Sequence, residues 1–301
     1  MHTKILAFIL MFNGFSSFSQ ADSAQLYNLL DTIVGMGHRV YSDTAVLDRV
    51  GCFIEAEFKE RSPVTYKQTY QIGGFRYSNI IALVGDTTKP RIVIGAHYDV
   101  CGEQDGADDN GSGVVGIILA LDQLKDYAGE YCLEFVAYTL EEPPLYNTEY
   151  MGSLQHSNWL KSRGTEVFGM VSLEMIGYFS DAKKSQSYPL GILKMIYGGK
   201  GDYITLVRKF EKGKFTRRFT KAFRKSKYIK TKKFTGPRKL TGIDFSDHRS
   251  YWSNGFDALM ITDTSFYRNA NYHKKSDTTE TLDFNRMADV VNAVVFAINK
   301  L

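Results

Sequence analysis

The sequence predicts an α/β fold with a central, mostly parallel sheet. Segments with strand-like and helix-like periodicity alternate along the chain. Several strand segments, such as RIVIGA, YCLEFVAYTL and VFGMVSLEM, are continuous apolar runs, as expected for strands covered on both faces. No Pro/Gly/Ser-rich linker or internal repeat divides residues 20–301, and a chain of 301 residues can bury a sizeable core. We therefore expect one domain over 20–301.

The N-terminus has the three parts of a secretory signal peptide. A short basic start, MHTK, precedes eight apolar residues, ILAFILMF, and then small residues that suit cleavage near Ser19 or Gln20. The apolar stretch is too short to span a bilayer, and no other stretch approaches the ~20 apolar residues of a membrane helix. We expect residues 1–19 to be removed and the protein to be exported, periplasmic or secreted, without stable membrane insertion.

The elements expected after the signal peptide follow from local periodicity. Apolar residues spaced three or four apart predict helices, whereas alternating or continuous apolar runs predict strands. The GGF turn at 73–75 joins two strand-like segments and indicates a hairpin. Helices are expected at 23–36, 43–61, 111–127, 150–164 and 284–301, and strands at 65–72, 77–85, 91–100, 131–140, 167–179 and 256–265.

The segment 208–239 is strongly basic, with fifteen Lys or Arg and a single acid, Glu211. We interpret it as helices with a solvated cationic face, because four phenylalanines recur there at helical spacing and are expected to face a core. They are Phe210, Phe215, Phe219 and Phe223. The alternative is contact with an anionic surface such as a membrane or polysaccharide. No nucleic-acid motif accompanies the segment, so we expect no nucleic-acid partner.

The three cysteines, Cys52, Cys101 and Cys132, are too few for a disulfide scaffold. Cys101 lies beside an acidic stretch, where a reactive thiolate is conceivable. We interpret it instead as a small buried residue.

Acids and imidazoles follow the ends of several predicted strands. Ligands of parallel α/β sheets bind beyond the carboxyl ends of the strands, so these side chains should meet at one edge. Crowded carboxylates repel one another, and two divalent cations would offset their charge. Imidazole and carboxylate donors suit zinc. The expected metal ligands are His97, Asp108, Glu142, Glu174 and His273.

Two further acids are expected to support the chemistry at this edge. Asp99 lies two residues from His97 on the same strand face, where it can accept the second ring N–H of that histidine. Glu141 adjoins Glu142, so in an extended strand one side chain can bind metal while the other meets water.

Neighbouring polar residues are interpreted as structural. Asp109 and Asn110 are expected to be turn and helix-cap residues at the start of the GSGVVG segment. Asp277 is expected to orient His273 or its loop.

Four more candidates receive the same interpretation. Asp247 and His248 are expected to give hydrogen-bonded support at the edge of the site. His38 and His156 lie in predicted helical surroundings without an evident acidic partner, and are taken as structural.

Six motifs in order resemble the co-catalytic di-zinc exopeptidases, a family that includes secreted bacterial aminopeptidases. They are GAHYDV, GADDNGSGVVGIILAL, YTLEE, SLEMIGY, FSDHRSYWSNGFDALMITDT and NYHKKSDTTETLD, and the resemblance covers roughly residues 75–301. It implies a three-layer α/β/α sandwich with a mixed sheet. It also implies a zinc exopeptidase that acts on the N-termini of peptides or proteins.

The resemblance assigns roles position by position. It gives one zinc, or another divalent metal, to His97, Asp108 and Glu174, and a second to Asp108, Glu142 and His273, with Asp108 bridging. Glu141 matches the general base that takes a proton from a metal-bound water and passes it to the leaving amine.

Three positions depart from the family pattern. Glu174 stands where many members have the shorter Asp, which leaves the reach of this ligand and the metal preference open. The segment 143–150, which joins the Glu-Glu pair to the next helix, is longer than in simpler members of the family. It is expected to line or cover the substrate pocket. Ile243 replaces a Tyr that donates to the substrate carbonyl in some members, so any such donor must come from elsewhere.

Two other functions fit the same scaffold. Related glutaminyl cyclases typically use one zinc, so counting zinc per chain would separate them from a di-zinc peptidase. A non-catalytic module would have lost metal ligands, whereas all five expected ligand positions are filled here.

Overall fold

The computed structural model describes residues 20–211 and 213–301. Eight strands form one sheet in the order β1-β2-β4-β3-β5-β8-β6-β7. Their bounds are β1 Val64–Ile72, β2 Phe75–Val84, β3 Arg91–His97, β4 Cys132–Tyr138, β5 Val167–Glu174, β6 Ile204–Lys209, β7 Thr231–Gly236 and β8 Ala258–Thr262. The helices are α1 Ser23–Gly35, α2 Thr44–Arg61, α3 Gly113–Leu124, α4 Gly152–Ser162, α5 Ile192–Tyr197, α6 Lys214–Ser226, α7 His248–Ser253 and α8 Phe284–Ile298.

The sheet is mixed, with parallel strands at its centre. The neighbours β4-β3-β5-β8 are parallel, and so are β6 and β7. The hairpin β1–β2 joins β4 in antiparallel orientation, and β6 joins β8 in the same way. Gly73 and Gly74 form the hairpin turn with positive φ angles, a conformation that glycine adopts without steric cost. The predicted α/β fold with a mixed sheet is confirmed.

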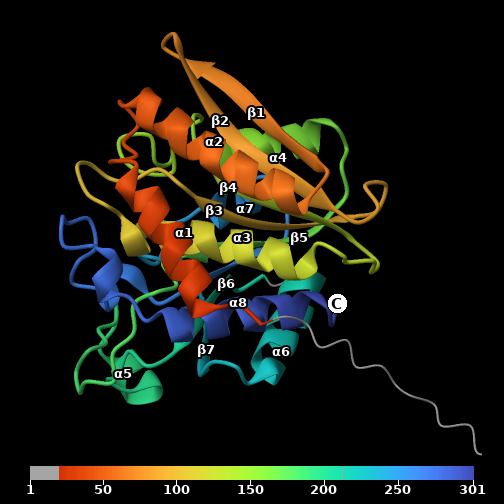
Figure 1. Cartoon of the computed structure of the whole chain (residues 1–301). Helices are drawn as coiled ribbons and strands as arrows, with labels where there is room; N and C mark the ends of the chain where they lie inside the picture. Colours follow the sequence, from red (N-terminus) through yellow and green to blue (C-terminus); the bar gives the residue numbers. More distant parts are fainter. Residues whose placement is uncertain (1–19, 212) are drawn as a thin grey trace, which may run out of the picture.

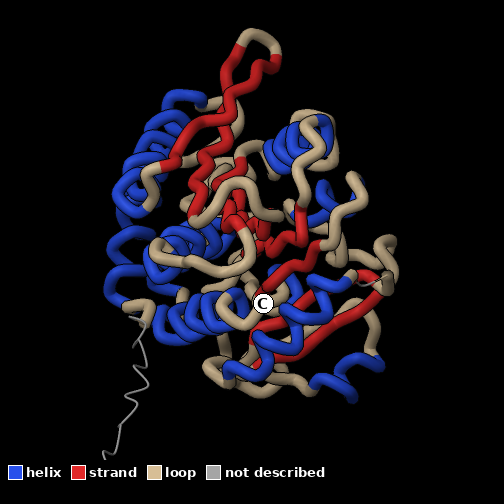
Figure 2. The backbone as a smooth tube through the Cα atoms, turned by 90° about the vertical axis from the view of Figure 1, so that its right-hand side faces the viewer, coloured by secondary structure: helices blue, strands red, loops and turns tan. Residues whose placement is uncertain are grey.

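Helices cover both faces of this sheet (Figures 1 and 2). Along β3, Ile92, Ile94 and Ala96 point to the face packed by α1, α2, α3, α6 and α8. Val93 points to the opposite face, which α4 and α7 cover. Strands buried on both faces therefore account for the continuous apolar runs.

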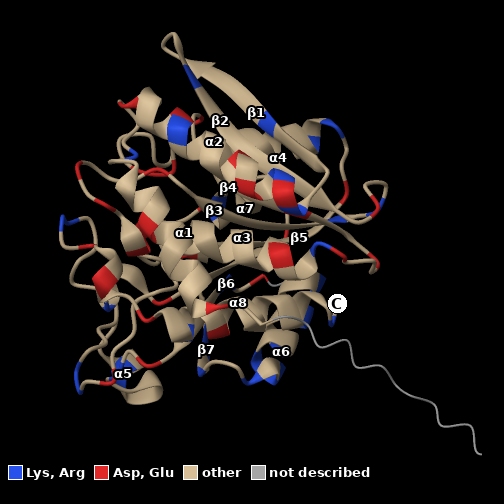
Figure 3. Cartoon of the chain, in the orientation of Figure 1, with Lys and Arg blue, Asp and Glu red and all other residues tan. Residues whose placement is uncertain are grey.

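The basic segment differs from the expected run of helices. It contains the end of strand β6, helix α6 and strand β7, and the cations of α6 lie on its outer face (Figure 3). Phe215, Phe219 and Phe223 are fully buried in the core, as predicted. The prediction is wrong for Phe210, which lies after β6 and is 63% exposed.

The predicted signal peptide lies outside the described residues. Within the described part of the chain, no helix combines the length and apolarity needed to cross a membrane.

A buried charge network links the sheet to α4. The Glu134 carboxylate accepts a hydrogen bond from Arg91 Nη1 at 2.8 Å, and lies 3.2 Å from His156 Nε2. His156 Nδ1 lies 2.7 Å from the hydroxyl of Tyr251. His156 is structural, but it does have an acidic partner, contrary to the prediction. His38 also has one, since its Nε2 lies 3.7 Å from Asp105.

We predict that Glu134→Gln lowers the free energy of unfolding by about 3–5 kcal/mol, because it leaves the Arg91 cation uncompensated inside the protein. Urea unfolding at pH 7 measures this difference. Burial by itself would raise the pKa of Glu134, but His156 and Arg91 outweigh it and hold the pKa below its usual value. The difference in unfolding free energy between wild type and Glu134→Gln should therefore have its full size above about pH 4.5. It should shrink as the pH falls through the lowered pKa of Glu134.

Glu130→Gln, on the exposed surface two residues before β4, is the matched control and should change stability by less than about 0.5 kcal/mol. Equal stability of the two variants would contradict a stabilising role for the Glu134 network.

Candidate metal centre

The carboxyl ends of three parallel strands meet at one edge of the sheet. His97 ends β3, Glu174 ends β5, and Glu141 and Glu142 follow β4 within four residues. His273 reaches the same edge from the long segment after β8. This convergence is the one expected for an open α/β sheet.

Donor atoms of these side chains lie close enough to share metal ions. His97 Nε2 lies 3.4 Å from Glu174 Oε2, and His273 Nε2 lies 3.3 Å from Glu142 Oε2. Asp109 lies between the two pairs: its Oδ1 is 3.7 Å from His97 Nε2 and its Oδ2 is 3.2 Å from His273 Nε2. One carboxylate therefore faces both imidazoles.

The structure places Asp109, not Asp108, in the position expected for a bridging ligand. Both oxygens of the buried Asp108 carboxylate are engaged elsewhere, accepting hydrogen bonds from Gly177 N at 3.0 Å and Asn269 Nδ2 at 2.8 Å. Asp109 and Asn110 have non-helical φ and ψ angles between two helical turns. The backbone therefore aims the Asp109 side chain away from its neighbour and toward the histidines. The interpretation of Asp109 as a cap residue is wrong.

Asp277 fixes this acidic loop and not the His273 ring. Its two oxygens accept hydrogen bonds from the backbone N–H groups of Asp108 and Asp109, each at 3.0 Å. Both N–H groups are thereby satisfied without solvent. The expectation that Asp277 orients His273 or the His273 loop is therefore wrong for its carboxylate, which supports the loop of Asp108 and Asp109 instead.

Arg39 supports the same loop and was missed by the sequence interpretation. Its fully buried guanidinium donates to the carbonyl oxygens of Tyr98, Asp105 and Gly106 at 2.7–2.9 Å. Burial lowers the pKa of Arg39 to about 10, so it stays charged at neutral pH. A single Arg between two predicted helices carries no pattern that would reveal these contacts.

Asp99 supports both sides of the centre. Its carboxylate accepts hydrogen bonds from the backbone N–H groups of Glu141 at 3.1 Å and Glu142 at 3.0 Å. His97 Nδ1 lies 3.5 Å from the same carboxylate and 3.3 Å from the Asp99 carbonyl oxygen. The expected contact with His97 is present, and Asp99 also sets the backbone of the Glu-Glu pair.

The titration of these groups reflects burial and crowding. Burial, with the nearby Asp109 charge, raises the pKa of Glu142 to about 8. Burial likewise raises the pKa of Glu141 well above its usual value. Burial would lower the pKa of His273, but Asp109 and Glu142 outweigh it and raise the value to about 10. Such shifts are typical of a site built around an added charge.

The donor set fits divalent cations. Within the described residues, four donor atoms of the centre are buried without a hydrogen-bond partner: Asp109 Oδ2, Glu142 Oε1, Glu174 Oε2 and His273 Nε2. Among the described residues the donor atoms form three overlapping groups: His97, Asp109 and Glu174; Cys101, Glu142 and His273; and His97, Glu141 and Glu142. Buried carboxylates and imidazoles left unpaired are costly, and zinc-type ions satisfy both donor types.

Three further residues border the centre. Cys101 adjoins the Glu142 and His273 donors, but burial and Glu142 raise its pKa to about 11, so it remains a thiol at neutral pH. His248 Nε2 lies 2.8 Å from the Ile243 carbonyl oxygen, and burial lowers the His248 pKa to about 3. Asp247 is fully buried and, like His248, does not join the groups of donor atoms.

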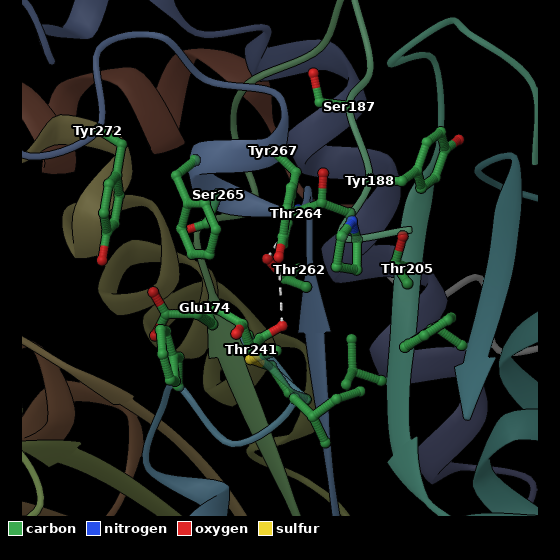
Figure 4. A pocket seen from close by; sticks show the side chains of 18 of the residues that line it. Glu174, Ser187, Tyr188, Thr205, Thr241, Thr262, Thr264, Ser265, Tyr267 and Tyr272 are labelled. Carbon is green, nitrogen blue, oxygen red and sulfur yellow. Dashed lines mark hydrogen bonds between the residues drawn. The ribbon is translucent and has the colours of Figure 1, made fainter. Parts of the chain in front are cut away.

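A cavity of about 330 Å³ opens directly beside these donors. Pro143 and Tyr146 line it, so the 143–150 segment borders the pocket as expected. The Tyr272 ring stacks on His273 with centroids 3.8 Å apart. Figure 4 shows Glu174 and Tyr272 at one end of the cavity and Tyr188 at the other.

Solved structures share this fold. The LapA aminopeptidase of Legionella pneumophila superimposes with a TM-score of 0.71 at 20% identity, covering 92% of this chain and 71% of LapA. A Bacteroides thetaiotaomicron glutaminyl cyclase bound to N-acetylhistamine gives 0.70 at 16% identity, covering 94% and 99%. At these identities the similarity shows the fold alone.

Sequence comparison is more specific. The Escherichia coli K12 protein named "Uncharacterized protein YfbL" is 36% identical over 257 residues, covering 83% of this chain and 79% of the relative. A "Probable leucine aminopeptidase" of Trichophyton verrucosum is 29% identical over 294 residues, covering 90% and 69%. The model of peptidase family M28 matches residues 79–298. The chain belongs to peptidase family M28.

Proposed function

We propose that this protein is an exported di-zinc aminopeptidase. The observation that carries the proposal is the Asp109 carboxylate, which faces His97 on one side and His273 on the other. Membership in a peptidase family and similarity to proteins named leucine aminopeptidase support it.

In this proposal one ion is held by His97, Asp109 and Glu174, and the other by Asp109, Glu142 and His273. When bound, zinc supplies Lewis acidity to a substrate carbonyl and to water. The carboxylate of Asp109 serves both ions, and the Asp277 hydrogen bonds keep its backbone fixed.

Glu141 is the proposed general base. The Glu141 carboxylate lies 3.9 Å from His97 Nε2, and the residue lines the cavity. Its backbone N–H donates a hydrogen bond to Asp99, which fixes the position of the main chain. It takes a proton from the attacking water as the new C–O bond forms, and delivers it to the nitrogen as the C–N bond breaks. Burial raises its pKa toward working pH, which suits a group that must both accept and release a proton.

We predict that zinc-loaded wild-type protein contains about two zinc ions per chain and hydrolyses aminoacyl-anilides, and that a chelator abolishes the hydrolysis. A content of about one zinc, with cyclisation of N-terminal Gln, would instead support a glutaminyl cyclase. Failure to bind zinc, with neither hydrolysis nor cyclisation of these substrates, would favour a non-catalytic module.

A pair of variants tests which aspartate bridges. Asp109→Asn should bind less than about one zinc per chain and lose at least about 100-fold in kcat/KM, because it removes the charge shared by both ions. Asp108→Asn should keep close to two zinc ions and lose less of its kcat/KM, since the contacts that it alters, with Gly177, Asn269 and Asp263, lie outside the donor groups. Metal analysis after gel filtration gives the answer, and the reverse order would return the bridge to Asp108.

Glu141→Gln should lower kcat by about 10²–10⁴-fold while leaving zinc content and KM nearly unchanged. The amide keeps the size of the side chain but cannot accept the proton. Glu149→Gln, an exposed carboxylate of the 143–150 segment, is the control and should retain full activity. Unchanged turnover in Glu141→Gln would show that another group is the base.

Export is tested by expressing the full chain and sequencing the N-terminus of the protein recovered outside the cytoplasm. The expected mature chain begins at Gln20 or Ala21, after removal of the basic and apolar start. An intact Met1 on active protein retained in the cytoplasm would overturn this part of the proposal.

A further inference from the structure

A row of polar side chains crosses the sheet from the metal centre to its edge strand. The strand register aligns Glu174 of β5 with Thr262 of β8, Thr262 with Thr205 of β6, and Thr205 with Lys232 of β7. All four residues line the cavity. Figure 4 shows Glu174, Thr262 and Thr205 in this order along the cavity floor.

The next row on the same face is apolar. Two residues along each strand, Met260 pairs with Val207 and Val207 with Phe234, and all three also line the cavity. Residues two apart in a strand point to the same face. The floor therefore has one polar and one apolar stripe, both leading away from the candidate ligands.

The polar row is longer than a single substrate residue. Neighbouring strands lie about 4.8 Å apart, so the backbone of β7 is about 14 Å from that of β5. A substrate residue held near Glu174 by its α-amine would extend a long side chain over Thr262 and Thr205. The side chain of Lys232, which also lines the cavity, would cover the rest of the distance.

Lys232 has no anionic partner of its own. Its ammonium group donates a hydrogen bond to the Tyr197 carbonyl oxygen and lies 3.5 Å from the centre of the Tyr203 ring. The nearby Asp202 carboxylate is paired with Lys230 at 2.7 Å. Among residues 20–211 and 213–301, no carboxylate forms an ion pair with Lys232.

The surroundings favour an incoming anion. Burial and the charges of Lys230 and Arg268 lower the pKa of Lys232 to about 8, so an added negative charge would stabilise the ammonium form. Arg268 Cζ lies 4.7 Å from the centre of the Tyr203 ring, the same ring that Lys232 contacts. Thr205 is 5% exposed, and its hydroxyl has no hydrogen-bond partner within the described chain.

We propose that Lys232 and Thr205 form a subsite for a substrate carboxylate at the end of the cavity away from the metal centre. The inference rests on the proposed peptidase function and specifies its substrate class. The carboxylate can come from the side chain of an N-terminal glutamate, or from the free C-terminus of a short peptide. Lys232 would pair with it, and Thr205 would donate its hydroxyl proton.

The first experiment compares Glu- and Gln-anilides, which differ in side-chain charge and lack a C-terminal carboxylate. A side-chain subsite predicts a kcat/KM ratio of Glu over Gln of about tenfold or more in wild-type protein, since a hydrogen bond to a charged group is involved. Lys232→Met should bring this ratio close to one, and Lys232→Arg should keep most of it. Lys233→Met, whose side chain is on the other face of β7, is the control and should keep the full ratio.

A second experiment compares kcat/KM for the dipeptide Leu-Leu, which has a free C-terminal carboxylate, with kcat/KM for its C-terminal amide. A preference for the free acid that Lys232→Met abolishes would assign the subsite to the C-terminal carboxylate. If Lys232→Met, folded by circular dichroism and melting temperature, changes neither ratio, the inference is overturned.

A binding measurement separates this inference from the proposed function. L-glutamate should raise the melting temperature of the zinc-loaded protein more than L-glutamine does, and Lys232→Met should remove the difference. If wild-type protein hydrolyses none of the substrates, the proposed function fails while this comparison still decides the side-chain subsite. Equal shifts with both amino acids, together with no Lys232-dependent preference for the Leu-Leu acid, would rule the subsite out.

Discussion

Repulsion among buried carboxylates is the constraint around which this structure is built. Asp109, Glu141, Glu142 and Glu174 meet at the carboxyl edge of the sheet, with only two imidazoles among them. Their backbones and orientations are held by groups that carry no metal-facing role, chiefly Asp99, Asp277 and the buried Arg39. The loops around the edge are thus shaped to keep like charges close together, an arrangement that divalent cations would stabilise.

The sequence predicts most of this arrangement because its key residues are tied to strand ends. His97, Glu142 and Glu174 follow continuous apolar strands, and parallel strands deliver their carboxyl ends to one edge. Asp108 and Asp109 are different, since they are adjacent and chemically identical. The contacts that distinguish them come from Gly177 and Asn269, about 70 and 160 residues away, which engage the carboxylate of Asp108 alone. The local sequence pattern around Asp108 and Asp109 does not reveal such distant partners.

The basic segment shows the opposite case, because the helical spacing of its phenylalanines holds only in α6 and not over the whole segment. The Phe spacing correctly predicts α6, where three rings face the core. The flanking strands β6 and β7 are short; β7 carries Lys232 and Lys233 and is an edge strand of the sheet, whereas β6 lies between β8 and β7. Charged residues are common on edge strands because they discourage pairing with other chains. The cationic character of β7 therefore reflects its position at the edge of the sheet, and not helix solvation.

The antiparallel pairing of β6 with β8 separates the sheet into two parts, the strands from β1 to β8 and the pair β6–β7. The parallel strands hold the reactive groups, whereas β6 and β7 supply only the floor and far end of the cavity. An outermost strand has a single hydrogen-bonded neighbour, so its side chains can change with little effect on the strands that carry the acids. Substitutions on β6 and β7 can therefore reshape the lining of the cavity while the strands that carry the acids stay in place.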